Sequence, residues 1–232
     1  MFAEKLGLHI LILLLGLAAG SCLREYIKNI LKEGRTEKAC MLVQRHKLPF
    51  FSGVEIINGL LWLRVAAIFD LSWELFFYCC AVSALLALSI IDWYTYEIPA
   101  RCNFFLALTG LGIMWAEAME MGAWSQVMWG HLIGSGVISL FLLGLLMASR
   151  GRAIGGGDVK LMAAAGLLLG WEKIILAFLI SCIAGSIVHP LLMKWKGRGR
   201  VLAFGPYLAF GIWIALIHGR EIIIWYFRYL FS

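Results

Sequence analysis

Long apolar runs recur along the whole sequence, and they constrain the fold more than any other feature. Each run is close to the roughly 20 residues that a helix needs to cross a bilayer. The chain is 62% hydrophobic and 15% charged, whereas about a quarter of the residues in a soluble domain are charged. Seven runs have this character: Leu8–Leu23, Val54–Phe69, Glu74–Ile91, Phe104–Met119, Val127–Met147, Ile174–Met193 and Leu202–Leu216. They predict an all-α, polytopic membrane helix bundle.

An eighth run, Gly157–Gly170, is shorter and rich in alanine, glycine and leucine. Small residues of this kind suit close packing between helices inside a membrane bundle. With about eight transmembrane helices, the loops that carry most of the lysines and arginines all fall on one side. Because basic loops stay in the cytoplasm, this count predicts that both termini lie outside.

The charge distribution also bears on domains and partners. We expect residues 1–232 to form a single transmembrane domain, in which residues 24–51 are a short basic cytoplasmic loop. The formal net charge is +6. Basic loops at a membrane surface attract anionic lipid headgroups, so this charge favours a bilayer partner over nucleic acid. The oligomeric state is left open.

Aspartate is the residue type that points to chemistry, because the chain has only three: Asp70, Asp92 and Asp158. Asp70 is interpreted as a solvated helix terminus. Asp92 follows an apolar run and Asp158 opens the short eighth run, so both map to the cytoplasmic edge of the bilayer. Two carboxylates at one depth suit an aspartic protease, in which repulsion keeps one proton shared between them.

Three glycines, Gly155, Gly156 and Gly157, directly precede Asp158. Glycine permits a positive φ and the close approach of a second backbone, such as an extended peptide substrate. The alternative is a flexible turn before a helix, with Asp158 as the helix cap. For Asp92 taken alone, the alternative to a catalytic role is a charged residue at a helix end, where water and headgroups reach it.

These residues carry a family resemblance. The Gly155–Asp158 segment and the apolar run after it resemble the G-x-G-D segment of the type IV prepilin peptidases, bacterial membrane aspartic proteases. Asp92, followed by Ile98-Pro99, is similar to the first catalytic aspartate of that family. The resemblance extends to three further segments: Phe204-Gly205-Pro206, Gly20-Ser21 and Val54-Glu55.

The resemblance implies a function and a set of site residues. It implies an enzyme that removes the basic leader peptide from a prepilin or pseudopilin of a type IV pilus or type II secretion system. Cleavage would occur at the cytoplasmic face of the bacterial inner membrane. The implied catalytic residues are Asp92 and Asp158, and the implied substrate-binding residues are Gly155, Gly156, Gly157, Phe204, Gly205 and Pro206.

The sequence departs from the longer family members in the loop after the first helix. Those members are expected to carry a cytoplasmic domain there, with two C-x-x-C pairs that bind zinc and a link to N-methylation. Here residues 24–51 offer only Cys40 and His46 as ligands, and two ligands do not close a tetrahedral zinc site. We therefore expect proteolysis without a metal or cofactor, and neither bound zinc nor methyl transfer from S-adenosylmethionine.

Two other functions remain as alternatives. One is a G-x-G-D protease that acts on other membrane proteins, and the other is a small cation-coupled or proton-coupled transporter. A transporter is expected to place an acidic residue near the bilayer midplane, which disfavours it here. Among other polar residues, His131 and His189 are expected to hydrogen-bond between helices, and Glu55 and Arg64 to face the bundle interior without pairing to each other.

Overall fold

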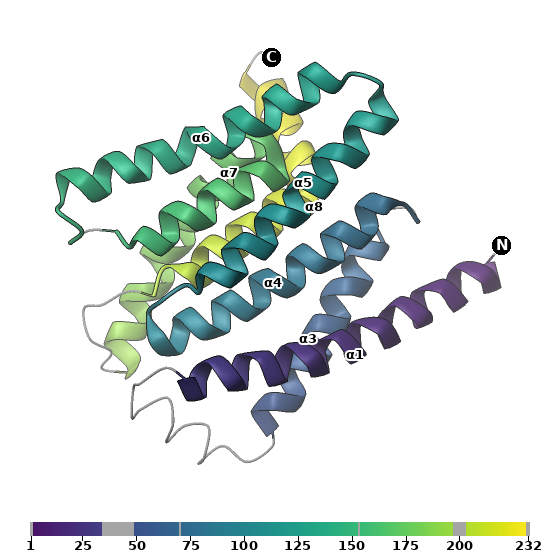
Figure 1. Ribbon diagram of the computed structural model, residues 1–232, viewed down its shortest axis with the longest axis horizontal. Coiled ribbons are helices and arrows are strands. Elements are labelled where there is room, and N and C mark those ends of the chain that lie inside the picture. The colour runs from purple at the N-terminus through teal and green to yellow at the C-terminus, as the bar shows by residue number, and fades with distance from the viewer. Residues whose placement is uncertain (1, 34–48, 70, 153, 197–202, 231–232) are drawn as a thin grey trace.

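The computed structural model is a bundle of long helices (Figure 1). It describes residues 2–33, 49–69, 71–152, 154–196 and 203–230. No strand occurs within these ranges, so the predicted all-α fold is confirmed. The helices are α1 (Phe2–Glu33), α3 (Pro49–Ala66), α4 (Trp73–Thr95), α5 (Ala100–Met121), α6 (Trp124–Ala148), α7 (Gly156–Lys196) and α8 (Gly205–Leu230).

The helices are those of a multi-pass membrane protein. Within the described residues, six of them (α1 and α4 to α8) are long and apolar enough to cross a bilayer. Their outer surfaces carry large apolar side chains, such as Leu14, Leu140 and Ile183. In water such a surface would be costly, whereas lipid tails solvate it.

The chain reverses direction inside α7, at Gly170. Gly170 has φ 76° and ψ 176°, which are not helical values. A straight helix of 41 residues would be about 60 Å long at 1.5 Å per residue. Instead, Lys173 packs on Gly219 in the second half of α8, and Gly185 packs on Phe204 just before α8 begins. The first half of α7 therefore matches the short helix predicted from the eighth apolar run.

Helices extend into both ends of the segment 24–51, which was predicted to be a loop. Helix α1 continues to Glu33 and α3 begins at Pro49, so residues 24–33 and 49–51 are helical. The extension of α1 has an apolar face: Ile27 and Leu31, one turn apart, are 1% and 5% exposed. Burial of that face stabilises the helix beyond its apolar core. Cys40, His46 and Asp70 lie outside the described residues.

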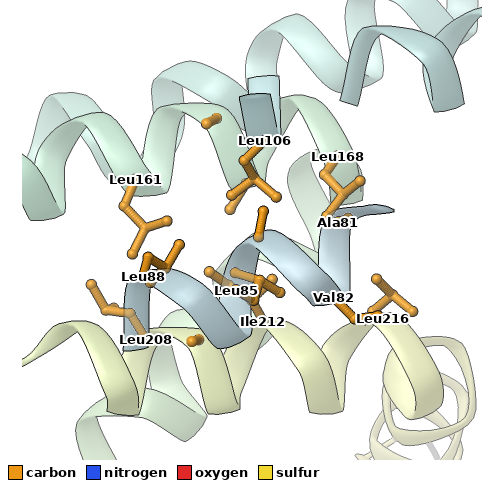
Figure 2. Packing of buried hydrophobic residues seen from close by; sticks show 14 of the residues in the cluster. Ala81, Val82, Leu85, Leu88, Leu106, Leu161, Leu168, Leu208, Ile212 and Leu216 are labelled. Atoms are coloured by element: carbon orange, nitrogen blue, oxygen red, sulfur yellow. The ribbon is translucent and has the colours of Figure 1, made fainter. Parts of the chain in front are cut away.

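A buried apolar core surrounds α4. Ala81, Val82, Leu85 and Leu88 project from its two sides toward α5, α7 and α8 (Figure 2). This central position places the C-terminal end of α4 between the ends of its neighbours.

Glycines set the closest helix contacts. A Cβ built on Gly166 of α7 would collide with the backbone of Gly134 in α6, and a Cβ on Gly134 would lie 2.6 Å from the Gly170 carbonyl carbon. Gly211 of α8 has an equally close contact with Ala177 and Ser181 of α7. Because lipid is as apolar as the side chains, this close backbone packing is a main source of helix association in a bilayer.

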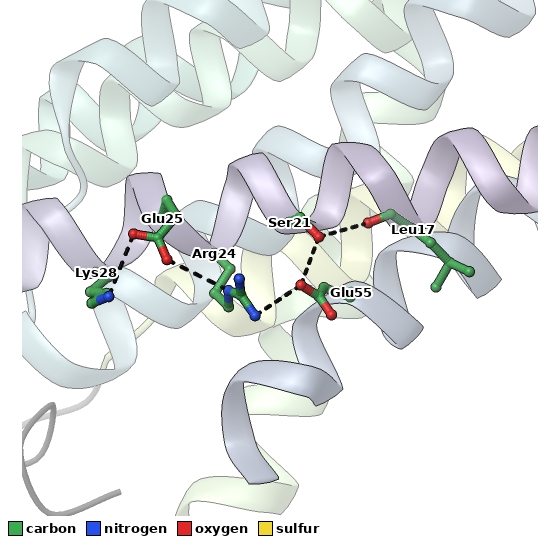
Figure 3. Close-up of polar contacts among 6 residues, drawn as sticks. All are labelled: Leu17, Ser21, Arg24, Glu25, Lys28 and Glu55. Carbon is green, nitrogen blue, oxygen red and sulfur yellow. Dashed lines mark hydrogen bonds and ion pairs between the residues drawn. The ribbon is translucent and has the colours of Figure 1, made fainter. Parts of the chain in front are cut away.

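A polar network joins α1 to α3 (Figure 3). The Ser21 hydroxyl donates to Glu55 Oε1 at 2.7 Å, and a guanidinium nitrogen of Arg24 lies 3.0 Å from the same oxygen. Gly20 permits the contact, because a Cβ there would lie 2.7 Å from Glu55 Cα. The segments Gly20-Ser21 and Val54-Glu55 thus pack against each other.

Other polar residues connect helices at the opposite end. His131 of α6 bonds the Leu167 carbonyl of α7 at 2.7 Å and Glu117 of α5 at 2.9 Å. Its predicted role between helices is confirmed, whereas that of His189 stays a prediction. Arg64 was expected to face the interior, but it is exposed and lies 3.2 Å from His218 of α8. An exposed arginine is tolerated at the end of a lipid-facing helix, because its long side chain can carry the charge to the membrane–water interface.

The Gly134–Gly166 contact can be tested by adding one methyl group. We expect Gly166→Ala to destabilise the protein by about 1–3 kcal/mol, because the new Cβ meets backbone, which cannot rotate away. Thermal unfolding in detergent measures the effect. Gly144→Ala is the matched control, since a Cβ there meets nothing within 4 Å. Equal melting temperatures for the two variants would contradict this packing.

Candidate active site

Asp92 lies in the last turn of α4, and it caps a helix from the far end of the sequence. Its carboxylate Oδ2 accepts the Gly205 backbone N–H at 2.9 Å. Gly205 is the first residue of α8, where N–H groups have no partner within the helix. The dipole of α8 also favours a negative charge at this point. Asp92 is thereby held at 4% exposure.

The start of α8 is built for this contact. Pro206 has no N–H, and the N–H groups of Tyr207 and Leu208 both donate to the Phe204 carbonyl. The Gly205 N–H is left for Asp92. A Cβ on Gly205 would lie 2.7 Å from Asp92 Oδ2, so only glycine fits. Phe204 and Pro206 flank the contact and are half-buried.

Asp158 lies in the first turn of α7, two residues after the helix begins at Gly156. Its Oδ2 accepts the Gly155 backbone N–H at 3.3 Å. This bond is one half of a capping box, in which an acidic side chain reaches back to the residue that precedes the helix. The sequence alternative placed Asp158 at the cap position itself, whereas the structure places Gly155 there and Asp158 inside the first turn. Asp158 is half-buried.

The three glycines before Asp158 differ from one another, and one expectation about them is wrong. Among the described residues, the glycines with positive φ are Gly122, Gly151 and Gly170. Residues 155–157 therefore do not adopt the positive φ that was expected of them. Gly157 allows a close approach, because a Cβ would lie 3.1 Å from Ile98 Cβ, a tight contact that would push the two segments apart. Gly155 and Gly156 are exposed, and a Cβ on Gly156 would meet nothing within 4 Å.

The two aspartates are brought together at one end of the bundle. Ile98, from the connection after α4, packs on Gly157, while α8 begins against Asp92. Asp158 lies close enough to Asp92 for the two carboxylates to interact electrostatically. All residues predicted for the site from the sequence are thus gathered here. Such a pair can hold a shared proton and activate a water molecule.

Sequence reasoning missed Asn103, a buried neighbour of this pair. It lies in the first turn of α5 at 5% exposure, and its Nδ2 donates to the Gly157 carbonyl at 3.3 Å. The available signal was an amide in an apolar helix, four residues after Pro99. Among the described residues, no group of three histidines, cysteines or acidic residues could hold a metal ion.

Comparison with known proteins agrees with this geometry. Residues 79–189 match the model of the type IV leader peptidase family, and this stretch includes both aspartates. Over this stretch the chain resembles that family. No solved structure gives a significant match to the chain.

Similar curated proteins are named prepilin leader peptidase/N-methyltransferase. The one from Stutzerimonas stutzeri is 30% identical over 76% of this chain and 61% of its own length. The one from Burkholderia pseudomallei is 36% identical over 68% of this chain and 51% of its own length. The one from Escherichia coli K12 is 33% identical over 61% of this chain and 61% of its own length. The match thus spans about half to three fifths of these relatives.

The cap formed by Asp92 can be tested by its effect on stability. We expect Asp92→Ala to destabilise the protein by about 0.5–2 kcal/mol, because the Gly205 N–H loses its acceptor. Asp92→Asn keeps a side-chain oxygen and should remain close to the wild-type melting temperature. If both variants unfolded at the same temperature, the carboxylate would not be acting as a cap.

Proposed function

We propose that this protein is an aspartic endopeptidase that removes the basic leader peptide from prepilin-like proteins. One observation carries the proposal: Asp92 of α4 and Asp158 of α7 lie at the same end of the bundle, within the stretch that matches the family model. Ile98, from the connection after α4, packs there on Gly157, next to Asp158. The relatives' names supply the substrate class, a prepilin, and we extend it to the pseudopilins of type II secretion.

The chemistry needs one protonated and one ionised carboxyl group. The ionised carboxylate takes a proton from water while the water oxygen attacks the scissile carbonyl carbon. The protonated partner donates to the carbonyl oxygen, which yields a tetrahedral intermediate. That intermediate collapses as the peptide nitrogen takes a proton from the dyad and leaves as an amine. Neither a metal nor S-adenosylmethionine takes part.

We further propose eight membrane crossings, with both termini outside and the aspartates at the cytoplasmic face of the bacterial inner membrane. Three exposed basic residues at the end that holds the aspartates support this orientation: Arg101 in the first turn of α5, and Arg150 and Arg152 in the connection between α6 and α7. The opposite end carries Glu117 and Glu172. The basic end would lie against anionic lipid headgroups.

The first half of α7 bears on the depth of the site. Residues 156–170 span about 22 Å at 1.5 Å per residue, which is less than the roughly 30 Å of a hydrocarbon core. A crossing this short draws Asp158 toward the apolar layer. A prepilin has its cleavage site at the same depth, where a polar leader meets an apolar helix.

The substrate surface follows from exposure. Gly155 and Gly156 are exposed beside Asp158, and we propose that the leader lies extended across them and Gly157, with Phe204 and Pro206 as its border. Gly205, which is buried and bonded to Asp92, acts through that carboxylate. Residues 1–232 function as a single transmembrane domain.

The dyad is tested by removing one carboxylate at a time. We expect Asp92→Asn and Asp158→Asn each to slow leader removal by about 10²–10⁴-fold, the usual contribution of acid–base catalysis. Each variant is expressed with a candidate prepilin, and cleavage is followed by gel mobility and by the mass of the new N-terminus. Glu172→Gln, at the far end of the bundle, is the matched control. Wild-type processing by either aspartate variant would remove the dyad from the mechanism.

The same mass measurement addresses methylation. We expect the mature product to carry an unmodified N-terminal amine, because residues 24–51 supply only two potential zinc ligands where longer relatives are expected to carry a separate domain. A strong chelator should leave the cleavage rate unchanged. A methylated product, or loss of cleavage on chelation, would contradict this part of the proposal.

A further inference from the structure

Asn103 is a buried polar residue that the proposed mechanism does not use. It is 5% exposed, and its Nδ2 donates to the carbonyl of Gly157, the residue before Asp158. Its Oδ1 is buried and has no hydrogen-bond partner among the described residues. The bond to a carbonyl fixes the orientation of the amide, because the flipped amide would face that carbonyl with its own oxygen.

A buried asparagine whose Oδ1 has no donor does not stabilise the fold as well as an apolar residue would. A buried acceptor without a donor costs free energy, whereas an apolar side chain of similar shape would cost little. Thr109, two turns along the same helix, shows the contrast, since its hydroxyl bonds the Leu106 carbonyl at 2.7 Å. Asn103 thus invites an explanation other than packing.

The position of Asn103 beside Gly157 explains why an amide is present there. The connection after α4 contributes Ile98, against which Gly157 packs, and α5 contributes Asn103, which holds the Gly157 carbonyl. The peptide unit that enters Asp158 is therefore held by the segment that follows Asp92. This arrangement ties the placement of the Asp158 carboxylate to the chain segment that follows Asp92.

We infer that Asn103 is a positioning residue, which holds the Gly157 peptide so that the Asp158 carboxylate keeps its working distance and direction relative to Asp92. This inference rests on the proposed function. Asn103 acts through Asp158 and does not itself exchange protons. Because small misplacements of a catalytic group reduce rates steeply, its loss should affect turnover more than substrate binding.

Asn103→Leu is the decisive variant, because leucine has a similar volume and no polar atoms. We expect kcat for leader removal to fall by about 10–100-fold, with KM within about twofold of wild type, a change that falls short of a tenfold affinity step. The melting temperature in detergent should be unchanged or higher, since the unpaired acceptor is gone. Asn103→Thr, whose hydroxyl can donate to the Gly157 carbonyl, should recover part of the lost kcat.

Thr109→Val controls for the removal of a buried polar group from α5, and it should keep the wild-type kcat. A wild-type kcat in Asn103→Leu would overturn the inference, as would a loss explained wholly by unfolding or an equal loss in the control. An Asp92→Asn variant that still cleaves would instead refute the proposed function. The two failures are thus read from different variants.

Discussion

The arrangement of this protein depends on close backbone contact between helices that have no hydrophobic reason to associate. In a bilayer, lipid tails solvate leucine as well as another helix does, so association relies on dispersion at short range and on a few polar bonds. The Gly134–Gly166 contact and the Gly211 contact with Ser181 are of this kind. They bring α6, both halves of α7 and α8 together, and this fixes the positions of the helix ends.

The candidate site uses those helix ends. Asp92 bonds the start of α8, 113 residues away in the sequence, and Asp158 bonds the residue that precedes α7. Each carboxylate therefore satisfies a backbone N–H that a membrane environment would make costly to leave unpaired. Capping and catalysis are compatible here, because a cap uses one carboxylate oxygen and also fixes the group in place for chemistry.

The reversal at Gly170 connects fold and site. It makes the first half of α7 a short, separate helix, and the second half returns the chain to the end of the bundle where α8 begins against Asp92. At the other end, His131 bonds the Leu167 carbonyl, three residues before the reversal, where helical bonding is interrupted. The bend is thus supported by a side chain from another helix as well as by the freedom of glycine.

The sequence by itself determined the membrane class and the apolar helices, and it singled out Asp92 and Asp158 as candidate site residues, because apolar length and rare charged residues are local properties of the chain. It misjudged the end of α1, the conformation of Gly155–Gly157 and the exposure of Arg64. It gave no indication that Gly157 and Asn103 meet. Only the tertiary structure decided those points, because each depends on which helix approaches which. That choice is set by glycine contacts and hydrogen bonds between residues far apart in the sequence, and local patterns do not record them.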